Sequence, residues 1–322
     1  MVIKQADDKT SQIASLQALQ ARPDASPETR TRIEREIRNI RAGMKGEAEA
    51  AYEIEFHYGQ SKNHAIIHDL RIECDGRVAQ IDHMVINRWL CIWVCESKHF
   101  AEGIAINEHG ECSTFYGGKP CGVPSPFEQN RKHITVLESA FKTGTAKLPT
   151  RLGLALKPRS QSLVLVSKNA RISRPKMKID GMDSIIKNDQ IKSFIDRAID
   201  QDNNPMSMAK LVGQDTLENF ARSIAAIHRP VVFNWAAKFG LPDLAPPELP
   251  GAGHPAARQA TATILPTGAV LAQAEQEAPM PKKKLICGNC SEPVAYNVAR
   301  FCWFNKAKFG GNVYCMECQK KV

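Results

Sequence analysis

The sequence contains no apolar segment that approaches the roughly 20 residues needed to cross a bilayer. Residues 1–21 are polar and lack the apolar core of a secretory signal. These two absences argue against a membrane protein and against a secreted one. We therefore expect a cytoplasmic protein with no membrane partner, in a compartment where disulfide bonds are rare.

The ten cysteines therefore need an explanation other than disulfides. Four of them form two Cys-x-x-Cys pairs near the C-terminus, Cys287 with Cys290 and Cys315 with Cys318. Several of the others lie in apolar strand patterns, which favours buried, reduced thiols. This scattered set comprises Cys74, Cys91, Cys95, Cys112, Cys121 and Cys302.

The chain is long enough for more than one domain, and its charge is positive. It has 322 residues and a formal net charge of +9. A basic excess suits a polyanionic partner such as nucleic acid, although many proteins without such a partner are mildly basic.

Composition and periodicity divide the chain into five parts. We expect a loosely attached N-terminal arm and a helix that starts at Ser26-Pro27, followed by an α/β domain and then a helical segment. A linker rich in proline and alanine separates these from a small cysteine module. The predicted bounds are 1–43, 44–200, 201–240, 241–284 and 285–322. The Arg- and Glu-rich helix before residue 44 is better explained as a solvated helix than as a DNA-binding one.

The α/β domain is predicted from alternating apolar patterns and turn residues. A second helix opens at Gly46, and strands are expected at 65–72, on both sides of an Asn87-Arg88 turn, at 104–106 and at 162–167. A glycine-rich loop is expected at 110–122, and helices at 126–141 and 189–199. Helices and strands in this order form one mixed α/β domain.

Residues 78–100 carry charges where strand cores usually carry apolar side chains. Alternation predicts one face with Val78, Gln80, Asp82, Met84 and Ile86, and another with Ile92, Val94, Glu96 and Lys98. Three charges at the ends of apolar rows are costly to bury without a partner or a task. Two carboxylates and a lysine held in this way can bind a divalent metal and attack a phosphodiester.

Two further residues complete the candidate site. Glu47 shares a helix face with Ala51 and Ile54, from which it could reach the charged end of the sheet. Alone it would be an ordinary glutamate in a first helical turn. Gln129 opens the helix that follows the strands. The candidate constellation is Glu47, Asp82, Glu96, Lys98 and Gln129.

These residues stand in four short motifs: Gly46-Glu47, Ala-Gln-Ile-Asp-His at 79–83, Val-Cys-Glu-Ser-Lys at 94–98, and Pro-Phe-Glu-Gln-Asn at 126–130. Their order and spacing resemble the nuclease-related domain, NERD, over about residues 44–141. That family is similar to the PD-(D/E)xK nucleases of the restriction-endonuclease-like fold. The resemblance implies a mixed sheet flanked by helices, and it implies nuclease chemistry. Cys95 and Ser97, beside Glu96, depart from the family pattern.

The resemblance also implies a role for each candidate residue. Asp82 and Glu96 match the metal-binding acids, and Glu47 matches an acid that helps to hold the metal, Mg²⁺ or Mn²⁺. Lys98 matches the lysine that positions or activates water. Gln129 matches a glutamine that orients the site.

The C-terminal module is predicted to bind zinc. Two Cys-x-x-Cys pairs suit tetrahedral Zn²⁺ with Cys287, Cys290, Cys315 and Cys318 as ligands. A segment this short has too little core to fold unaided, and zinc ligation would supply the missing free energy. Cys302 could replace one ligand, or it could be a small core residue. The module resembles the four-cysteine zinc ribbons at the tails of type I topoisomerases, which bind single-stranded DNA.

Aromatic and basic residues interleave inside this module. Aromatic rings stack on bases and cations meet phosphates, so we predict that the module binds nucleic acid. Alternatively, the rings form the small core and the charges only solvate it. The predicted nucleic-acid-binding residues are Arg300, Trp303, Phe304, Lys306 and Lys308.

The sequence thus predicts a metal-dependent nuclease, with DNA the expected substrate and the zinc ribbon aiding binding. Two alternatives are open. The chain could be a nucleic-acid-binding protein that keeps the nuclease fold without the chemistry, or an adaptor whose ribbon grips another protein.

Overall fold

The computed structural model describes residues 1–177, 179–202, 210–242, 286–294, 298–299, 302, 309–310 and 312–320. By internal contacts the chain divides into two compact units, Met1–Ala272 and Gln273–Val322. The predicted linker at 241–284 lies almost entirely outside the described residues. The boundaries predicted from the sequence stay predictions.

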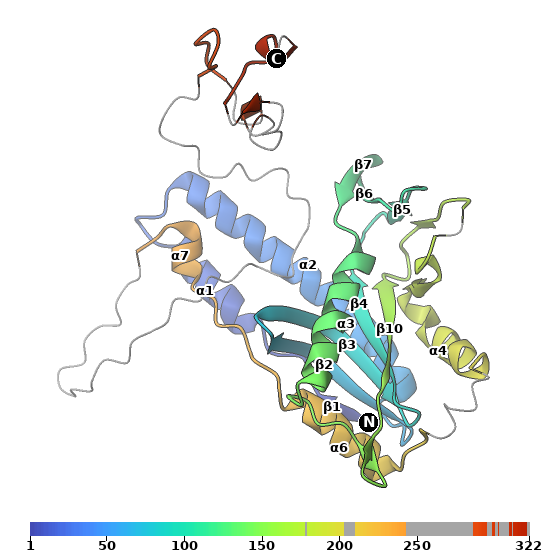
Figure 1. Cartoon of the computed structure of the whole chain (residues 1–322). Helices are drawn as coiled ribbons and strands as arrows, with labels where there is room; N and C mark the ends of the chain where they lie inside the picture. The colour runs from blue at the N-terminus through green and yellow to red at the C-terminus, as the bar shows by residue number, and fades with distance from the viewer. Residues whose placement is uncertain are drawn as a thin grey trace, which may run out of the picture. The chain divides into compact units, whose positions relative to one another are not determined.

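A six-stranded mixed sheet forms the centre of the first unit, in the order β1-β2-β3-β4-β10-β12 (Figure 1). Strands β2, β3 and β4 pair antiparallel, whereas β1 joins β2, and β10 joins β4 and β12, in parallel. Tight turns explain the antiparallel pairs: Asp75 and Gly76 both take a positive φ between β2 and β3. The strands are β1 (Val2–Lys4), β2 (His64–Cys74), β3 (Arg77–Asn87), β4 (Cys91–Lys98), β10 (Arg159–Val166) and β12 (Ile185–Lys187).

Helices cover both faces of this sheet. Figure 1 shows α3 (Pro126–Lys142) crossing one face and α2 (Pro27–Tyr58) passing behind the other. Helix α6 (Gln214–Ala225) packs on the α3 side, where Phe220 meets Phe141. Helix α4 (Ile191–Asp200) packs on the α2 side through Ile191 and Ile195. This arrangement confirms the mixed sheet flanked by helices that the sequence predicted.

Helix α6 belongs to the same core as the sheet. Its side chains Leu217, Phe220, Ala221 and Ile224 lie in the cluster that also holds Ile67 and Ile81. The packing therefore does not end near residue 200, where the sequence suggested the end of the α/β domain.

Helix α2 is continuous through Gly46, so the expected division into two helices near residue 45 is wrong. Ser26 caps its start by accepting a hydrogen bond from Thr29 N, with Pro27 in the first turn, as predicted. Gly46 is buried where the helix passes His99, and a Cβ built there would lie 2.8 Å from His99 Cβ. The glycine is required by this close approach and does not end the helix.

The N-terminal residues are also more firmly attached than the sequence suggested. Strand β1 forms one edge of the central sheet by pairing with Ile66 and Ile67. Helix α1 (Thr10–Gln20) packs against α2 and α7 (Trp235–Phe239), with Leu16, Ile33 and Trp235 in one apolar cluster. The expectation of a loose arm is therefore wrong.

A second, smaller sheet has the order β11-β5-β6-β7. The segment at 110–122, expected as a loop, is a hairpin of β6 and β7 that turns at Gly117 and Gly118, both with positive φ. Its strands are β5 (Ile104–Ile106), β6 (Cys112–Tyr116), β7 (Lys119–Val123) and β11 (Ile172–Ser173). A separate two-stranded pair joins β8 (Thr150–Arg151) to β9 (Leu154–Ala155), and short 3-10 turns cover Met182–Ser184, Asn188–Gln190 and Cys318–Lys320.

Alternation along β2 and β3 breaks at one place. Ala79 and Ile81 pack into the same core cluster as Met84 and Ile86, although residue numbers on one face of a strand should differ by an even number and 81 and 84 differ by three. The irregularity coincides with Asp69 on β2, whose φ of 52° is unusual for a residue other than glycine. The predicted single row from Val78 to Ile86 is therefore wrong.

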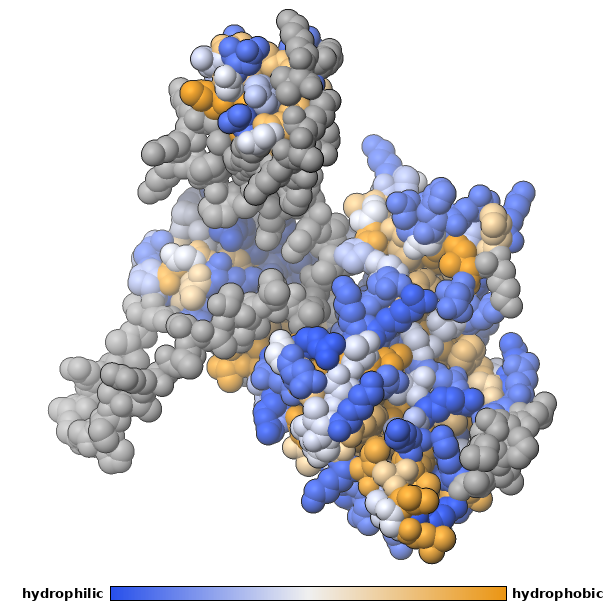
Figure 2. Space-filling model, viewed as in Figure 1, coloured by the Kyte–Doolittle hydropathy of each residue, from blue (hydrophilic) through white to orange (hydrophobic). Residues whose placement is uncertain are grey.

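The surface of the first unit is mixed in character. In the view of Figure 2, hydrophilic residues cover most of the coloured face and apolar groups lie between them. Tyr52 and Phe56, on the outer side of α2, are 65% and 70% exposed. Among the described residues, none of the helices combines the length and the apolar character required to span a bilayer. The cytoplasmic location stays a prediction.

Candidate active site and cysteine cluster

The predicted charged residues of the two strands meet at one end of the central sheet. The β3–β4 ladder ends with the pair His83–Cys95, and Asp82 and Glu96 are the next residues on the two strands. Beyond this point the side chain of Asp82 replaces strand pairing, because its Oδ2 accepts hydrogen bonds from Ser97 N at 2.7 Å and Ser97 Oγ at 2.8 Å. Ser97, a departure from the family pattern, thus fixes the orientation of Asp82.

Glu96 is buried on the α3 side of the sheet. Ile92 and Val94, which were predicted to share a strand face with Glu96, lie in the core cluster beneath α3. Only 2% of the Glu96 side chain is exposed, and Lys98 Nζ lies 2.7 Å from its Oε1. Among the residues that the structure describes, its Oε2 has no hydrogen-bond partner, although His133 Nδ1 is 3.4 Å away.

Glu47 approaches from α2 and completes a carboxylate cluster, which we define as Glu47, Asp82 and Glu96. Burial raises the pKa of Glu47 to about 7, and the charge of Asp82 adds to this effect against the opposing charge of Lys9. Burial likewise raises the pKa of Glu96 to about 8, again with a contribution from Asp82 and against Lys98. Asp82 is therefore close enough to both glutamates for its charge to disfavour their ionisation.

Two lysines offset part of this negative charge. Burial lowers the pKa of Lys98, but Glu96, Asp82 and Glu47 outweigh it, so the net shift is upward. Lys9, between β1 and α1, behaves in the same way and lies 2.6 Å from Glu47 Oε2. Lys9 could not be singled out from the sequence, because it stands in a polar segment far from the four motifs.

Helix α3 supplies the remaining part of the site. Gln129 is half-buried one turn before His133 and makes no side-chain hydrogen bond to the described residues. Burial lowers the pKa of His133 to about 4, so the ring beside Glu96 is neutral near pH 7. Asn130 fastens the helix to the sheet by donating to Val94 O at 2.7 Å and to Ser162 Oγ at 2.9 Å. The spacing of four residues between Gln129 and His133 was the available signal for this histidine.

The cluster suits a cation although it does not form a ready cage. A buried carboxylate oxygen without a partner, beside two other acids, is a donor set that a hard divalent ion would satisfy. Within the described part of the chain, however, only the four cysteines bring three or more potential ligand atoms within 4.8 Å of one another. Metal binding at the carboxylate cluster would therefore require its side chains to move closer together.

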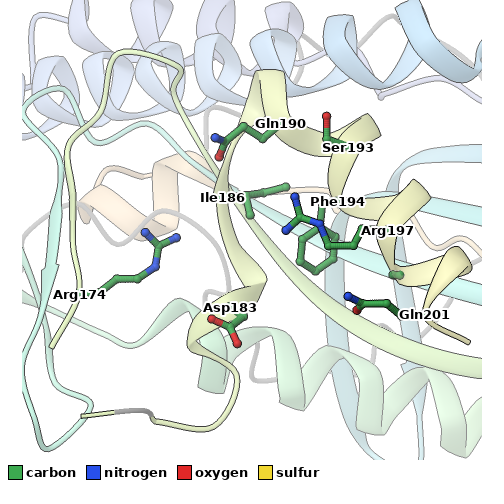
Figure 3. Close-up of a pocket in the computed structure, with 9 residues that line it drawn as sticks. Arg174, Asp183, Ile186, Gln190, Ser193, Phe194, Arg197 and Gln201 are labelled. Atoms are coloured by element: carbon green, nitrogen blue, oxygen red, sulfur yellow. The ribbon is translucent and has the colours of Figure 1, made fainter. Parts of the chain in front are cut away.

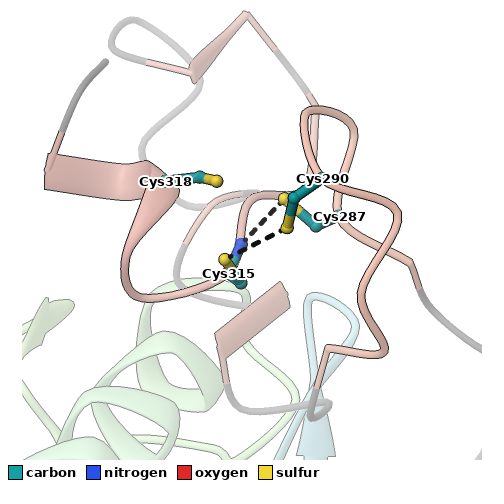
Figure 4. A group of neighbouring side chains, drawn as sticks. All are labelled: Cys287, Cys290, Cys315 and Cys318. Carbon is teal, nitrogen blue, oxygen red and sulfur yellow. Dashed lines mark hydrogen bonds between the residues drawn. The ribbon is translucent and has the colours of Figure 1, made fainter.

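The cysteine cluster lies in the second unit. Cys287, Cys290, Cys315 and Cys318 hold their sulfur atoms within 4.8 Å of one another (Figure 4). Cys315 N donates to Cys287 Sγ at 3.3 Å, and Asn289 Nδ2 donates to Cys318 Sγ at the same distance. Such bonds stabilise thiolates around a metal ion.

Cys302 is not among these four residues. Its sulfur accepts hydrogen bonds from Tyr314 N at 3.3 Å and Gln319 Nε2 at 3.2 Å. The arrangement therefore favours the reading of Cys302 as a small core residue. The predicted nucleic-acid-binding residues of this module, Arg300, Trp303, Phe304, Lys306 and Lys308, lie outside the described residues.

A hollow of the first unit is separate from the carboxylate cluster. It measures about 870 Å³ and lies beside α4 and β12 (Figure 3). Arg174 faces the α4 side chains Phe194 and Arg197 across it, with Asp183 nearby. None of the five predicted catalytic residues lines it.

Comparison with known proteins gives one match. The sequence matches the family described as the nuclease-related domain over residues 42–166, a range that begins within α2 and ends with β10. Neither the curated proteins nor the solved structures contain a match to the chain. The matched range contains all five predicted catalytic residues together with Asn130 and His133. Residues 42–166 of this chain are therefore a nuclease-related domain, as the motifs around Asp82 and Glu96 predicted.

Proposed function

We propose that this protein is a metal-dependent nuclease that hydrolyses phosphodiester bonds, with DNA as the expected substrate. The nuclease-related domain supports a nuclease-related function in general. The finer proposal is supported by the placement of Asp82 and Glu96 directly after the last pair of the β3–β4 ladder, with Lys98 Nζ 2.7 Å from Glu96 and the charges of Asp82 and Glu47 acting on Glu96. Ligand sites of open α/β sheets commonly lie at this end of the parallel strands.

Glu47, Asp82 and Glu96 would hold the divalent cation, Mg²⁺ or Mn²⁺. When bound, such an ion supplies positive charge to the scissile phosphate and makes water a better nucleophile. Ser97 keeps Asp82 in one orientation through two hydrogen bonds. The protein thereby fixes one ligand before the cation arrives, which reduces the reorganisation needed on binding.

Lys98 and the residues of α3 would act on the substrate side. Lys98 has an ammonium group 2.7 Å from Glu96, where it can hold the attacking water and offset negative charge on the phosphate. Burial lowers the pKa of His133 to about 4, so near pH 7 the ring is neutral and adds no positive charge beside Glu96. Gln129 makes no side-chain hydrogen bond within the described part of the chain, so its amide can orient the water or the phosphate.

We further propose that the cysteine cluster binds Zn²⁺ and that its module contributes to nucleic-acid binding. Four thiolates in a small module are the donor set of structural zinc sites. The positive net charge of +9 favours a polyanionic partner. Binding by this module should weaken steeply as the salt concentration rises.

The direct test is metal-dependent nicking of supercoiled plasmid by the full chain, purified free of contaminating nucleases. Asp82→Asn and Lys98→Met should reduce the rate by at least about a hundredfold, because each removes a charged group from the reacting centre. Asp75→Asn, in the exposed β2–β3 turn, is the matched control and should cleave like the wild type. Equal rates in the wild type and Asp82→Asn would end the proposal, as would a lack of metal-dependent cleavage of DNA and RNA in either strand form.

A further inference from the structure

Lys9 makes the most specific contact with the carboxylate cluster from outside the nuclease-related domain. Its Nζ lies 2.6 Å from Glu47 Oε2, and only 23% of the Lys9 side chain and 25% of the Glu47 side chain are exposed. The two residues are 38 positions apart in the sequence. The contact therefore depends on the path of the chain between β1 and α1.

Several hydrogen bonds fix that path. Asp7 N donates to Asp69 Oδ2 at 3.1 Å, and Asp7 Oδ2 lies 2.8 Å from His228 Nε2. Lys4 Nζ donates to Asp69 O at 3.0 Å on the other side of the segment. Lys9 is thus presented to the cluster by backbone that is tied to β2, unlike a lysine on a free surface.

The position of Lys9 matches that of a cation in the carboxylate cluster. Lys98 forms an ion pair with one carboxylate oxygen of Glu96, and Lys9 forms an ion pair with one carboxylate oxygen of Glu47. Each lysine therefore contacts an oxygen atom that could otherwise bind a metal ion. The charge of Asp82 also contributes to the raised pKa of Lys9. Lys98 comes from the same strand as Glu96, whereas Lys9 lies outside the strands, where its flexible side chain can turn away from Glu47 while the backbone stays tied to β2.

We infer that Lys9 occupies a cation position of the carboxylate cluster and exchanges with a divalent metal, so that this lysine sets the metal affinity of the site. The inference rests on the metal site of the proposed function but not on catalysis. Removing the ammonium group while keeping the length of the side chain, as in Lys9→Met, frees Glu47 and removes a competing positive charge. Lys9→Arg keeps the charge.

The test is Mn²⁺ binding to the full chain, already saturated with Zn²⁺, measured by electron paramagnetic resonance without nucleic acid. We expect Lys9→Met to lower the Kd for Mn²⁺ by about tenfold or more, since a half-buried positive charge near the ion is removed. Lys9→Arg should bind like the wild type. The matched control is Lys238→Met. Lys238 Nζ lies 2.9 Å from Glu36 Oε1, and Glu36 is on α2 three turns before Glu47, so this variant removes the same kind of ion pair away from the carboxylate cluster. The Mn²⁺ signal that Asp82→Asn weakens is the signal of the ion bound at the carboxylate cluster.

Unchanged or weaker Mn²⁺ binding in both Lys9→Met and Lys9→Gln, with wild-type circular dichroism and Tm, would overturn the inference. Loss of cleavage in Lys9→Met at unchanged Mn²⁺ affinity would make Lys9 a catalytic residue instead and would overturn it too. If neither the wild type nor the variants bind Mn²⁺, the inference and the metal site of the proposed function fail together. A protein that binds Mn²⁺ more tightly after Lys9→Met, yet cleaves no nucleic acid, would support the inference and refute only the nuclease proposal.

Discussion

Gly46 is the position where a single methyl group should disturb the candidate active site most selectively. In Gly46→Ala the new Cβ would lie 2.8 Å from His99 Cβ and 3.3 Å from His99 N. Carbon atoms pack best at about 3.5–4.0 Å, so α2 and the end of β4 must separate by roughly 0.7 Å or more. Both neighbouring atoms are on or next to the backbone of His99, and neither can turn away.

Two opposing effects set the change in stability. Overpacking a tight contact costs about 1–3 kcal/mol, whereas alanine is favoured over glycine inside a helix by about 1 kcal/mol. We expect Gly46→Ala to lower the free energy of unfolding by about 0–2 kcal/mol. The effect on function should be larger, because Glu47 is the next residue and a shift of about 1 Å at a reacting centre can cost about a hundredfold in rate.

Gly43→Ala is the matched control on the same helix. Its added Cβ would have Glu47 Oε1 at 3.8 Å as its nearest neighbour, which is an ordinary contact. This variant should gain about 0.5–1 kcal/mol in stability and keep wild-type cleavage. Urea denaturation and metal-dependent plasmid nicking measure both quantities. If Gly46→Ala is as stable and as active as Gly43→Ala, the close approach to His99 does not position Glu47 and the reasoning fails.

Three further predictions concern the acids, the α3 anchor and the cysteines. Because the pKa of Glu96 is raised to about 8 from its ordinary value of 4.5, the folded protein keeps a proton that the unfolded chain releases. The free energy of unfolding without added metal should therefore fall as the pH rises from about 4.5 to 8, and Glu96→Gln should flatten this slope by up to about 1.4 kcal/mol per pH unit. An unchanged slope in urea denaturation would contradict the assignment. Asn130→Ala should lower the free energy of unfolding of the first unit by about 2 kcal/mol in the same assay, because the buried carbonyl groups of Val94 and Leu163 lose the hydrogen bonds that Asn130 donates. A decrease of less than about 0.5 kcal/mol would contradict the role of Asn130 as an anchor of α3. Cys290→Ser should lower the amount of bound zinc, measured with a colorimetric chelator. Nuclear magnetic resonance spectra should show that only the second unit unfolds. A lower Tm of the first unit would contradict the independence of the two units.

The regular parts of the fold could be predicted because local signals agree with the packing there. Alternating apolar residues and the Asp75-Gly76 turn specified β2 and β3, and Ser26-Pro27 specified the start of α2. Local signals failed where tertiary contacts override them. Gly46 reads as a helix boundary until the approach to His99 is known, and the glycines of 110–122 read as a loop although they serve a hairpin.

The candidate site was predictable to the extent that its residues are close in sequence. Asp82, Glu96 and Lys98 stand on two strands joined by a tight turn, so strand geometry alone brings them near one another. Lys9 and His133 reach the same place from segments 38 residues before Glu47 and 37 residues after Glu96. The periodicities of helices and strands relate only residues that are a few positions apart, so they cannot predict contacts at such separations. These contacts depend on the three-dimensional path of the chain.

The break in alternation at Asp69 explains why a charged site can exist at the end of an apolar sheet. A regular ladder would continue past His83–Cys95 and would satisfy the backbone of Ser97 with a strand partner. Here the side chain of Asp82 supplies that partner by accepting a hydrogen bond from Ser97 N. Asp69, which has a φ of 52°, accepts hydrogen bonds from Gln80 Nε2 and Asp7 N through its carboxylate. The two aspartates thus replace backbone pairing with carboxylate oxygens at adjacent positions. The same replacement leaves acids clustered, so each acid disfavours the ionisation of Glu47 or Glu96 beside it, and a divalent cation bound by their oxygens would offset that repulsion.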